Sequence, residues 1–89
     1  MNIAQKKRLK AEAHHLKPVI IVGAQGVTDA LIKETNYALE AHELIKVKVN
    51  GEDKADRNNI AMRLCEALKA EFLQLIGSTA IIYRRKQEK

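Results

Sequence analysis

A short apolar run that ends in two closely spaced glycines is the feature that most constrains the fold. Residues 19–22 read Val-Ile-Ile-Val, and Gly23 and Gly26 follow with two residues between them. Four β-branched residues favour a strand, and an unbroken apolar run is typical of a strand buried on both faces. Thr28 is a good N-cap for a helix that starts directly after the turn. The segment therefore predicts a strand, a tight turn and a helix, and such turns often hold a phosphate.

Hydrophobic periodicity continues the chain as helices and strands on both sides of this unit. Pro18 ends a preceding helix because the residue before a proline is pushed out of the α region. Gly77 and Ser78, with glycine first, suit a type II′ turn between two closing strands. The expected elements are helices over residues 3–15, 29–41 and 54–71 and strands over residues 19–22, 44–49, 72–76 and 79–84.

The connections between these elements limit the topology. Helical crossovers make the first three strands parallel if they are direct neighbours, and the hairpin makes the fourth strand antiparallel to the third. In the second strand, Ile45, Val47 and Val49 alternate with Lys46 and Lys48, so we expect one face in the core and two lysines in solvent. The predicted fold class is α+β, of order α-β-α-β-α-β-β, a two-layer α/β sandwich with a four-stranded mixed sheet.

Positive charge gathers at the two ends of the chain. The 89 residues carry a net charge of +5. Residues 1–17 hold five basic residues against one acidic residue, a net +4, and residues 84–89 hold four against one, a net +3, which leaves −2 for the middle. Lys6, Lys10 and Lys17 recur at helical spacing on one face of the first helix. Segregated positive charge is expected of a nucleic-acid binder, and solvated tails are the alternative interpretation.

Length and composition exclude several classes of protein. A chain of 89 residues predicts one domain, with a core over about residues 9–84 and a basic tail over residues 85–89. No apolar run approaches the roughly 20 residues that cross a bilayer, and no apolar segment follows the N-terminus as in a secretory signal. The single cysteine, Cys65, forms no internal disulfide. We expect a cytoplasmic monomer without a membrane partner.

The motifs of enzymes and cofactor-binding proteins are missing from the sequence. The first glycine pair of the dinucleotide fingerprint G-x-G-x-x-G is missing here, since only Gly23 and Gly26 are present, and a P-loop needs a lysine directly after its last glycine. His14 and His15 are adjacent and diverge on a helix, so they lack metal-ligand spacing. Three aromatic residues are too few for a base-stacking platform. We therefore expect no catalytic residues, no metal and no cofactor.

Three blocks of sequence resemble a known family. They read LKAEAHHLKPVIIVGAQGVTDALI, HELIKVKV and LIGSTAIIYRRK, and they span about residues 9–86. In order and spacing they resemble the CRM domain, closest to its stand-alone bacterial form, the YhbY-type RNA-binding proteins. The resemblance implies a fold similar to the C-terminal domain of translation initiation factor 3. It also implies RNA binding: bacterial members associate with precursors of the large ribosomal subunit, and plant relatives serve in group II intron splicing.

The resemblance also implies a set of RNA-binding residues in the GxxG loop, the basic first helix and the closing basic segment. Many relatives carry a lysine inside the loop and another after the hairpin glycine, where this chain has Ala24-Gln25 and Ser78. These differences give more weight to residues 6–17 and 84–86. The candidate RNA-binding residues are Lys6, Lys7, Lys10, Lys17, Gly23, Ala24, Gln25, Gly26, Arg84 and Arg85.

Two hypotheses for function follow. The main one is binding to structured ribosomal RNA during assembly of the large ribosomal subunit, with the basic ends neutralising phosphates. The alternative is a protein-interaction module whose acidic second helix, with Glu34 and Glu40, docks a basic ribosomal protein. Charge reversal at these two glutamates separates the hypotheses, because it abolishes ribosome association only in the second.

Overall fold

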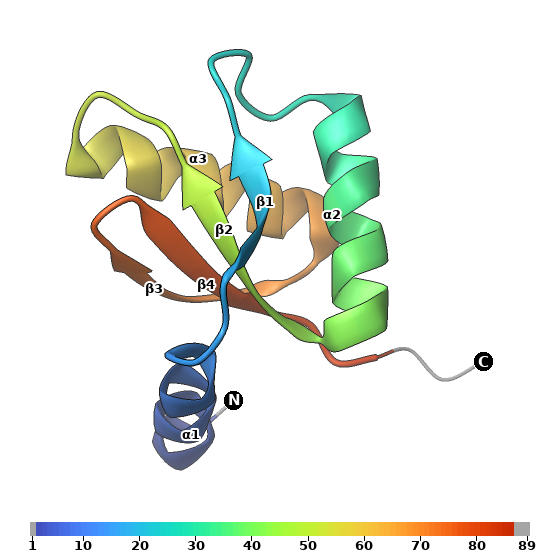
Figure 1. Cartoon of the computed structure of the whole chain (residues 1–89), viewed down its shortest axis with the longest axis vertical. Coiled ribbons are helices and arrows are strands. Elements are labelled where there is room, and N and C mark those ends of the chain that lie inside the picture. Colours follow the sequence, from blue (N-terminus) through green and yellow to red (C-terminus); the bar gives the residue numbers. More distant parts are fainter. Residues whose placement is uncertain (1, 87–89) are drawn as a thin grey trace.

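The computed structural model describes residues 2–86 as three helices and one four-stranded sheet (Figure 1). The last three residues of the expected basic tail lie outside the described residues. The elements are α1 (Ile3–Ala13), β1 (Pro18–Val22), α2 (Asp29–His42), β2 (Leu44–Val49), α3 (Lys54–Leu68), β3 (Glu71–Ile76) and β4 (Thr79–Tyr83). This order confirms the predicted α+β fold class.

The strands of the sheet lie in the order β1-β2-β4-β3. β1 pairs with β2 in parallel, and β4 is antiparallel to both of its neighbours. The first three strands therefore run in one direction, as expected, but β3 is not a neighbour of β2. The hairpin at Gly77 folds β4 back into the space between them, which gives β2 an antiparallel partner.

The main core lies between one face of the sheet and the two helices α2 and α3, which Figure 1 shows on one side of the sheet. Alternate residues of β2 face this core, with Val47 and Val49 fully buried. On α2, Leu31 and Leu39 lie on the same face as Thr35, whose buried hydroxyl donates to the carbonyl of Leu31 at 2.7 Å. Amphipathic helices over one sheet face form the two layers that the alternating pattern predicts.

The other face of the sheet is covered only at one end, by α1. Ala13 is fully buried there against Leu44, Leu73 and Ile81. The rest of this face, toward the loop after β1, has no helix over it, and we call it the open face (Figure 1). Ile21 projects from it with 63 % of its surface exposed. The prediction that β1 is buried on both faces was therefore wrong, because an edge strand with helices on one side only can carry the same apolar run.

Side-chain caps set where the helices begin, and backbone geometry ends α3 early. Thr28 Oγ1 accepts from Leu31 N at 3.1 Å, and Asp53 Oδ1 accepts from Asp56 N at 2.8 Å, as the sequence predicted. α3 ends at Leu68 rather than near residue 71, because Lys69 adopts a left-handed φ of 55°. α1 likewise ends at Ala13, two residues before its predicted end at 15.

Candidate nucleic-acid interface

The turn Gly23–Gly26, which we call the GAQG loop, lies at the tip of β1. Gly26 has a left-handed φ of +73°, and its N–H donates to the carbonyl of Gly23 at 3.0 Å, which closes the turn. Gly23 has no left-handed φ, and a Cβ added there would meet no atom within 4 Å. Glycine is therefore required by backbone conformation at Gly26 but not at Gly23.

The loop contributes backbone and small side chains rather than charge. Gly23, Ala24 and Gln25 are exposed, and a cavity of about 360 Å³ lies between them and the start of α2. The charged residue that lines this cavity is Glu34, and Asp29 occupies the first turn of α2. Both carboxylates oppose a phosphate on the α2 side, so an anion is better accommodated on the β1 side of the loop.

Helix α1 carries the largest group of predicted site cations. Lys7 is exposed, and Lys6 and Lys10 are half-buried. α1 and the GAQG loop lie at opposite ends of β1 (Figure 1), separated by the length of a five-residue strand, roughly 16 Å. The predicted residues of α1 and of the loop therefore form two groups at the two ends of one strand rather than one cluster.

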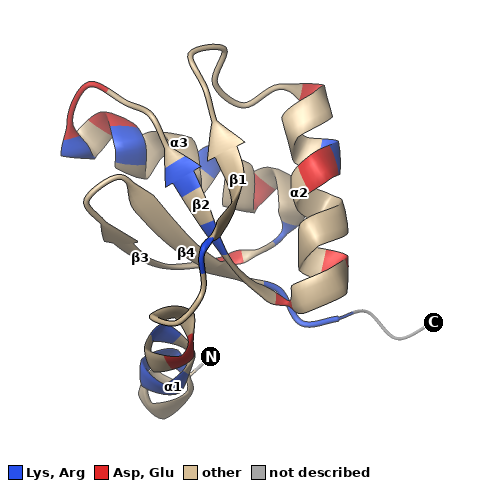
Figure 2. Ribbon diagram, viewed as in Figure 1, with Lys and Arg blue, Asp and Glu red and all other residues tan. Residues whose placement is uncertain are grey.

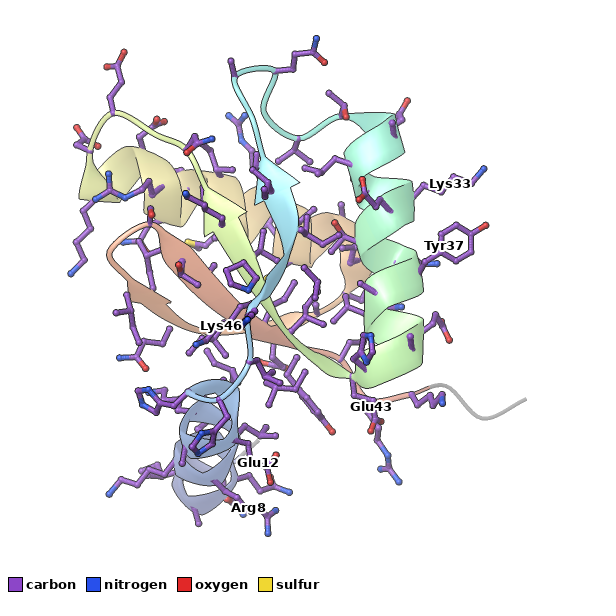
Figure 3. The ribbon with its side chains drawn as sticks, viewed as in Figure 1. Arg8, Glu12, Lys33, Tyr37, Glu43 and Lys46 are labelled. Carbon is purple, nitrogen blue, oxygen red and sulfur yellow. The ribbon has the colours of Figure 1, made fainter. Side chains whose placement is uncertain are left out.

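Lysines on the open face connect these two groups. Lys17 is exposed just before β1, and Lys46 and Lys48 project from the adjacent strand β2. Figure 2 shows separate blue patches on α1, on the segment just before β1 and on β2, and Figure 3 shows Lys46 where β1 and β2 lie together. The candidate site residues did not include the two β2 lysines. Their alternation with valines already indicated solvent exposure, but not that their face adjoins α1 and the loop.

Arg84 does not extend this surface, because its guanidinium is engaged inside the molecule. The side chain is only 12 % exposed. It donates to the carbonyl of Leu68 at 3.0 Å, to Asn36 Oδ1 at 2.8 Å and to Glu40 Oε1 at 3.3 Å. These contacts tie the segment after β4 to α2 and to the end of α3, and we call them the Arg84 clamp. They argue against the predicted role of Arg84 in RNA contact, whereas Arg85 is exposed.

The acidic face of α2 is smaller than the sequence indicates. Glu40 pairs with Arg84, and Glu43 Oε2 accepts from Lys86 N at 2.7 Å. Lys33 and Tyr37 project outward from the same helix (Figure 3). Of the two glutamates that the alternative hypothesis invoked, Glu34 alone is both exposed and free of an ion pair among residues 2–86.

Other chemistry has little basis in the described part of the chain. Within residues 2–86, no group of three His, Cys, Asp or Glu side chains is placed to hold a metal ion. Burial, and secondarily the charge of Glu71, raises the pKa of Cys65 from 9.0 to about 12, so its thiol stays protonated and is a poor nucleophile near neutral pH. None of the helices described over these residues is both long and apolar enough to cross a membrane.

The fold and the site together define a class: a small α+β domain with one basic, open sheet face and a glycine turn at its edge. The chain belongs to the CRS1/YhbY (CRM) domain family, whose sequence profile matches residues 1–84. This confirms the resemblance drawn from the three sequence blocks.

Two curated relatives and one solved structure match over most of their length. The chain is 42 % identical over 84 residues to a protein of Bacillus subtilis named probable RNA-binding protein YqeI, covering 94 % of this chain and 88 % of that one. It is 40 % identical over 88 residues to a protein of Haemophilus influenzae named RNA-binding protein, covering 99 % and 89 %. The solution structure of SAV1595 from Staphylococcus aureus matches with a TM-score of 0.87 at 36 % identity, covering 99 % of this chain and 92 % of that one.

Proposed function

We propose that this protein binds RNA through a continuous surface made of α1, the open face and the GAQG loop. The observation that carries the proposal is a line of cations without carboxylate partners. Residues 2–86 contain one ion pair, between Arg84 and Glu40, so the lysines of α1 and β2 are free to neutralise phosphates. Free cations along one face favour a polyanion over a protein surface of mixed charge.

Gly23 supports the same surface by a separate argument. Neither its backbone angles nor its surroundings require glycine, so folding does not explain the residue. A ligand backbone that approaches the end of β1 closely does explain it, since any side chain there would stand between the ligand and the loop. In this proposal the loop lies at the edge of the RNA contact rather than in a charged phosphate cage.

The RNA in this proposal is structured ribosomal RNA, met during assembly of the large ribosomal subunit in the cytoplasm. The names of the relatives support RNA as the ligand class, and the resemblance to YhbY-type proteins supports the ribosomal precursor. The chain acts as a monomer without a cofactor and performs no catalysis. Its contribution is to hold RNA by phosphate contacts that depend on salt.

Sedimentation of a tagged copy through a sucrose gradient of cell lysate tests the proposal. The wild type is expected to travel with large-subunit precursors at moderate salt and to be released at high salt. The variant Lys6→Gln/Lys10→Gln is expected to leave the particles at lower salt than the wild type. The control is Lys33→Gln, which removes an exposed lysine on α2, away from the proposed surface.

Two outcomes contradict the proposal. A wild-type protein that stays at the top of the gradient at both salts does not bind ribosomal particles. Loss of association in Glu34→Lys, with the α1 variant unaffected, supports docking of a basic protein on α2 instead. Glu34 is preferred to Glu40 for this test because a change at Glu40 also removes part of the Arg84 clamp.

A further inference from the structure

The register of the sheet aligns four side chains across all four strands at the loop end of the open face. Ile21 is paired with Lys48, Lys48 with Thr79, and Thr79 with Ile76. Directly paired residues project to the same face, so these four form one row, which we call the outer row. Two of its members are aliphatic and exposed, Ile21 at 63 % and Ile76 at 46 %.

A second row, nearer to α1, lies parallel to the first. Pro18 is paired with Lys46, Lys46 with Ile81, and Ile81 with Gln74. A shallow cavity of about 230 Å³ lies where the end of α1 meets the two rows. Its lining residues are His14, Pro18, Lys46, Ile76, Thr79 and Ile81. Neither row nor the cavity contains a carboxylate.

Charge and apolar surface alternate across this area. Lys46 and Lys48 lie two residues apart on β2, so their Cα atoms are roughly 7 Å apart. In the outer row Lys48 lies between Ile21 and Thr79, and the exposed Ile76 follows Thr79. A ligand that matches the area must offer repeated negative charge together with flat apolar faces.

The geometry points to unpaired RNA nucleotides as the ligand of the open face, an inference that rests on the proposed function. In a duplex the bases are stacked inward, and a protein meets mainly phosphates and 2′-hydroxyls. A duplex would therefore satisfy the lysines but leave Ile21 and Ile76 without apolar partners. Unpaired nucleotides present base and sugar faces to the isoleucines while their phosphates reach Lys46 and Lys48.

Charge complementarity also distinguishes this ligand from a protein partner. An apolar protein surface laid over the outer row would desolvate Lys48 without pairing it, which is costly. A nucleic-acid strand supplies a phosphate for each lysine at the same time as it covers the aliphatic groups. The open face thus binds single-stranded RNA, while α1 contacts the neighbouring phosphates.

The test is a fluorescence anisotropy titration of the full chain with two labelled RNAs. One is a blunt 20-base-pair duplex, and the other is the same duplex with an eight-nucleotide uridine extension. The variants are Ile21→Thr, Ile76→Thr and the double substitution, which keep β-branched side chains at exposed strand positions. Met62→Thr is the control, since Met62 is 49 % exposed on α3, on the covered side of the sheet.

The wild type is expected to bind the extended RNA more tightly than the blunt duplex. Each single substitution replaces an ethyl group by a hydroxyl, and the loss of two buried apolar carbons weakens binding of the extended RNA by roughly fifteenfold while duplex binding stays unchanged. The double variant loses the preference, and the Met62 control keeps it. Thermal unfolding followed by circular dichroism confirms that all variants are folded.

Three other outcomes overturn the inference in distinguishable ways. Equal binding of both RNAs by the wild type rejects unpaired nucleotides as the ligand but keeps RNA binding. A preference that survives the double substitution places single-strand binding away from the open face. Failure of the folded wild type to bind either RNA rejects the proposed function, and this inference with it.

Discussion

The Arg84 clamp leads to a prediction that separates a structural role from an RNA contact. In Arg84→Ala the chain loses the donors to Leu68, Asn36 and Glu40. The contacts of one guanidinium are not additive, so together they are assigned the value of one charged hydrogen bond, about 1.5–3 kcal/mol. The ion pair with a partly exposed carboxylate adds about 0.2–1 kcal/mol. We therefore expect the free energy of unfolding to fall by about 2–4 kcal/mol.

This loss is large enough to measure as a change in melting temperature. One kcal/mol shifts the melting temperature of a domain of this size by roughly 4–8 °C, so the variant should melt on the order of 10–20 °C lower. The matched control is Arg85→Ala, which removes the neighbouring exposed arginine. That variant should change the free energy of unfolding by less than about 0.5 kcal/mol.

The assay combines urea unfolding with RNA titration at a temperature where every variant is folded. Arg84→Lys should recover little stability, because an ammonium cannot reach all three acceptors as the planar guanidinium does. RNA affinity of Arg84→Ala should stay within about threefold of the wild type. Unchanged stability together with a large loss of RNA affinity would refute the clamp and restore Arg84 as an RNA contact.

Four further predictions concern the loop, the basic helix and, in two cases, the buried thiol. Gly26→Ala should destabilise the fold by about 1 kcal/mol because of its positive φ, whereas Gly23→Ala should unfold like the wild type and bind RNA more weakly. Lys6→Gln/Lys10→Gln should lower the slope of log affinity against log salt by about one unit per lysine. Cys65, with its pKa raised from 9.0 to about 12, should react with a thiol reagent at pH 8 on the order of a thousandfold more slowly in the folded chain than in urea. The same pKa predicts that stability falls as pH rises above about 9, since the folded state then binds the proton more tightly than the unfolded state.

The first three of these predictions each have a contradicting result. Equal melting temperatures for the two glycine variants would mean that the turn tolerates a Cβ at both positions. A salt slope unchanged by the α1 substitutions, and equal to that of Lys33→Gln, would remove α1 from the surface. Fast modification of Cys65 in the folded chain, at the rate seen in urea, would show that the main core opens readily.

The sequence predicted local structure well because local rules determine it. Thr28 and Asp53 cap their helices, and the Gly77 turn joins β3 to β4, since each motif works through hydrogen bonds only a few residues apart. Helix ends were less accurate. α3 stops at Lys69 through a left-handed residue that is not glycine, and a lysine gives no sequence signal for that conformation.

Features that depend on distant parts of the chain could not be predicted in the same way. An apolar run such as residues 19–22 looks identical whether one or both sheet faces are covered, so the exposure of Ile21 was missed. Arg84 contacts Glu40 and Asn36, which precede it in the chain by 44 and 48 positions. No local pattern distinguishes such an arginine from the exposed Arg85. The two β2 lysines became site candidates only when the topology placed them between α1 and the loop.

The position of β4 has a consequence for how the protein is made. The last strand of the chain is an inner strand of the sheet, and β3 has no other partner. During synthesis, β2 and β3 therefore emerge before the strand that joins them, and the sheet closes in one late step once residue 83 is free. A nascent chain halted before residue 79 would leave the facing edges of β2 and β3 without backbone hydrogen-bond partners. The open face is thus complete only after β4 has been synthesised.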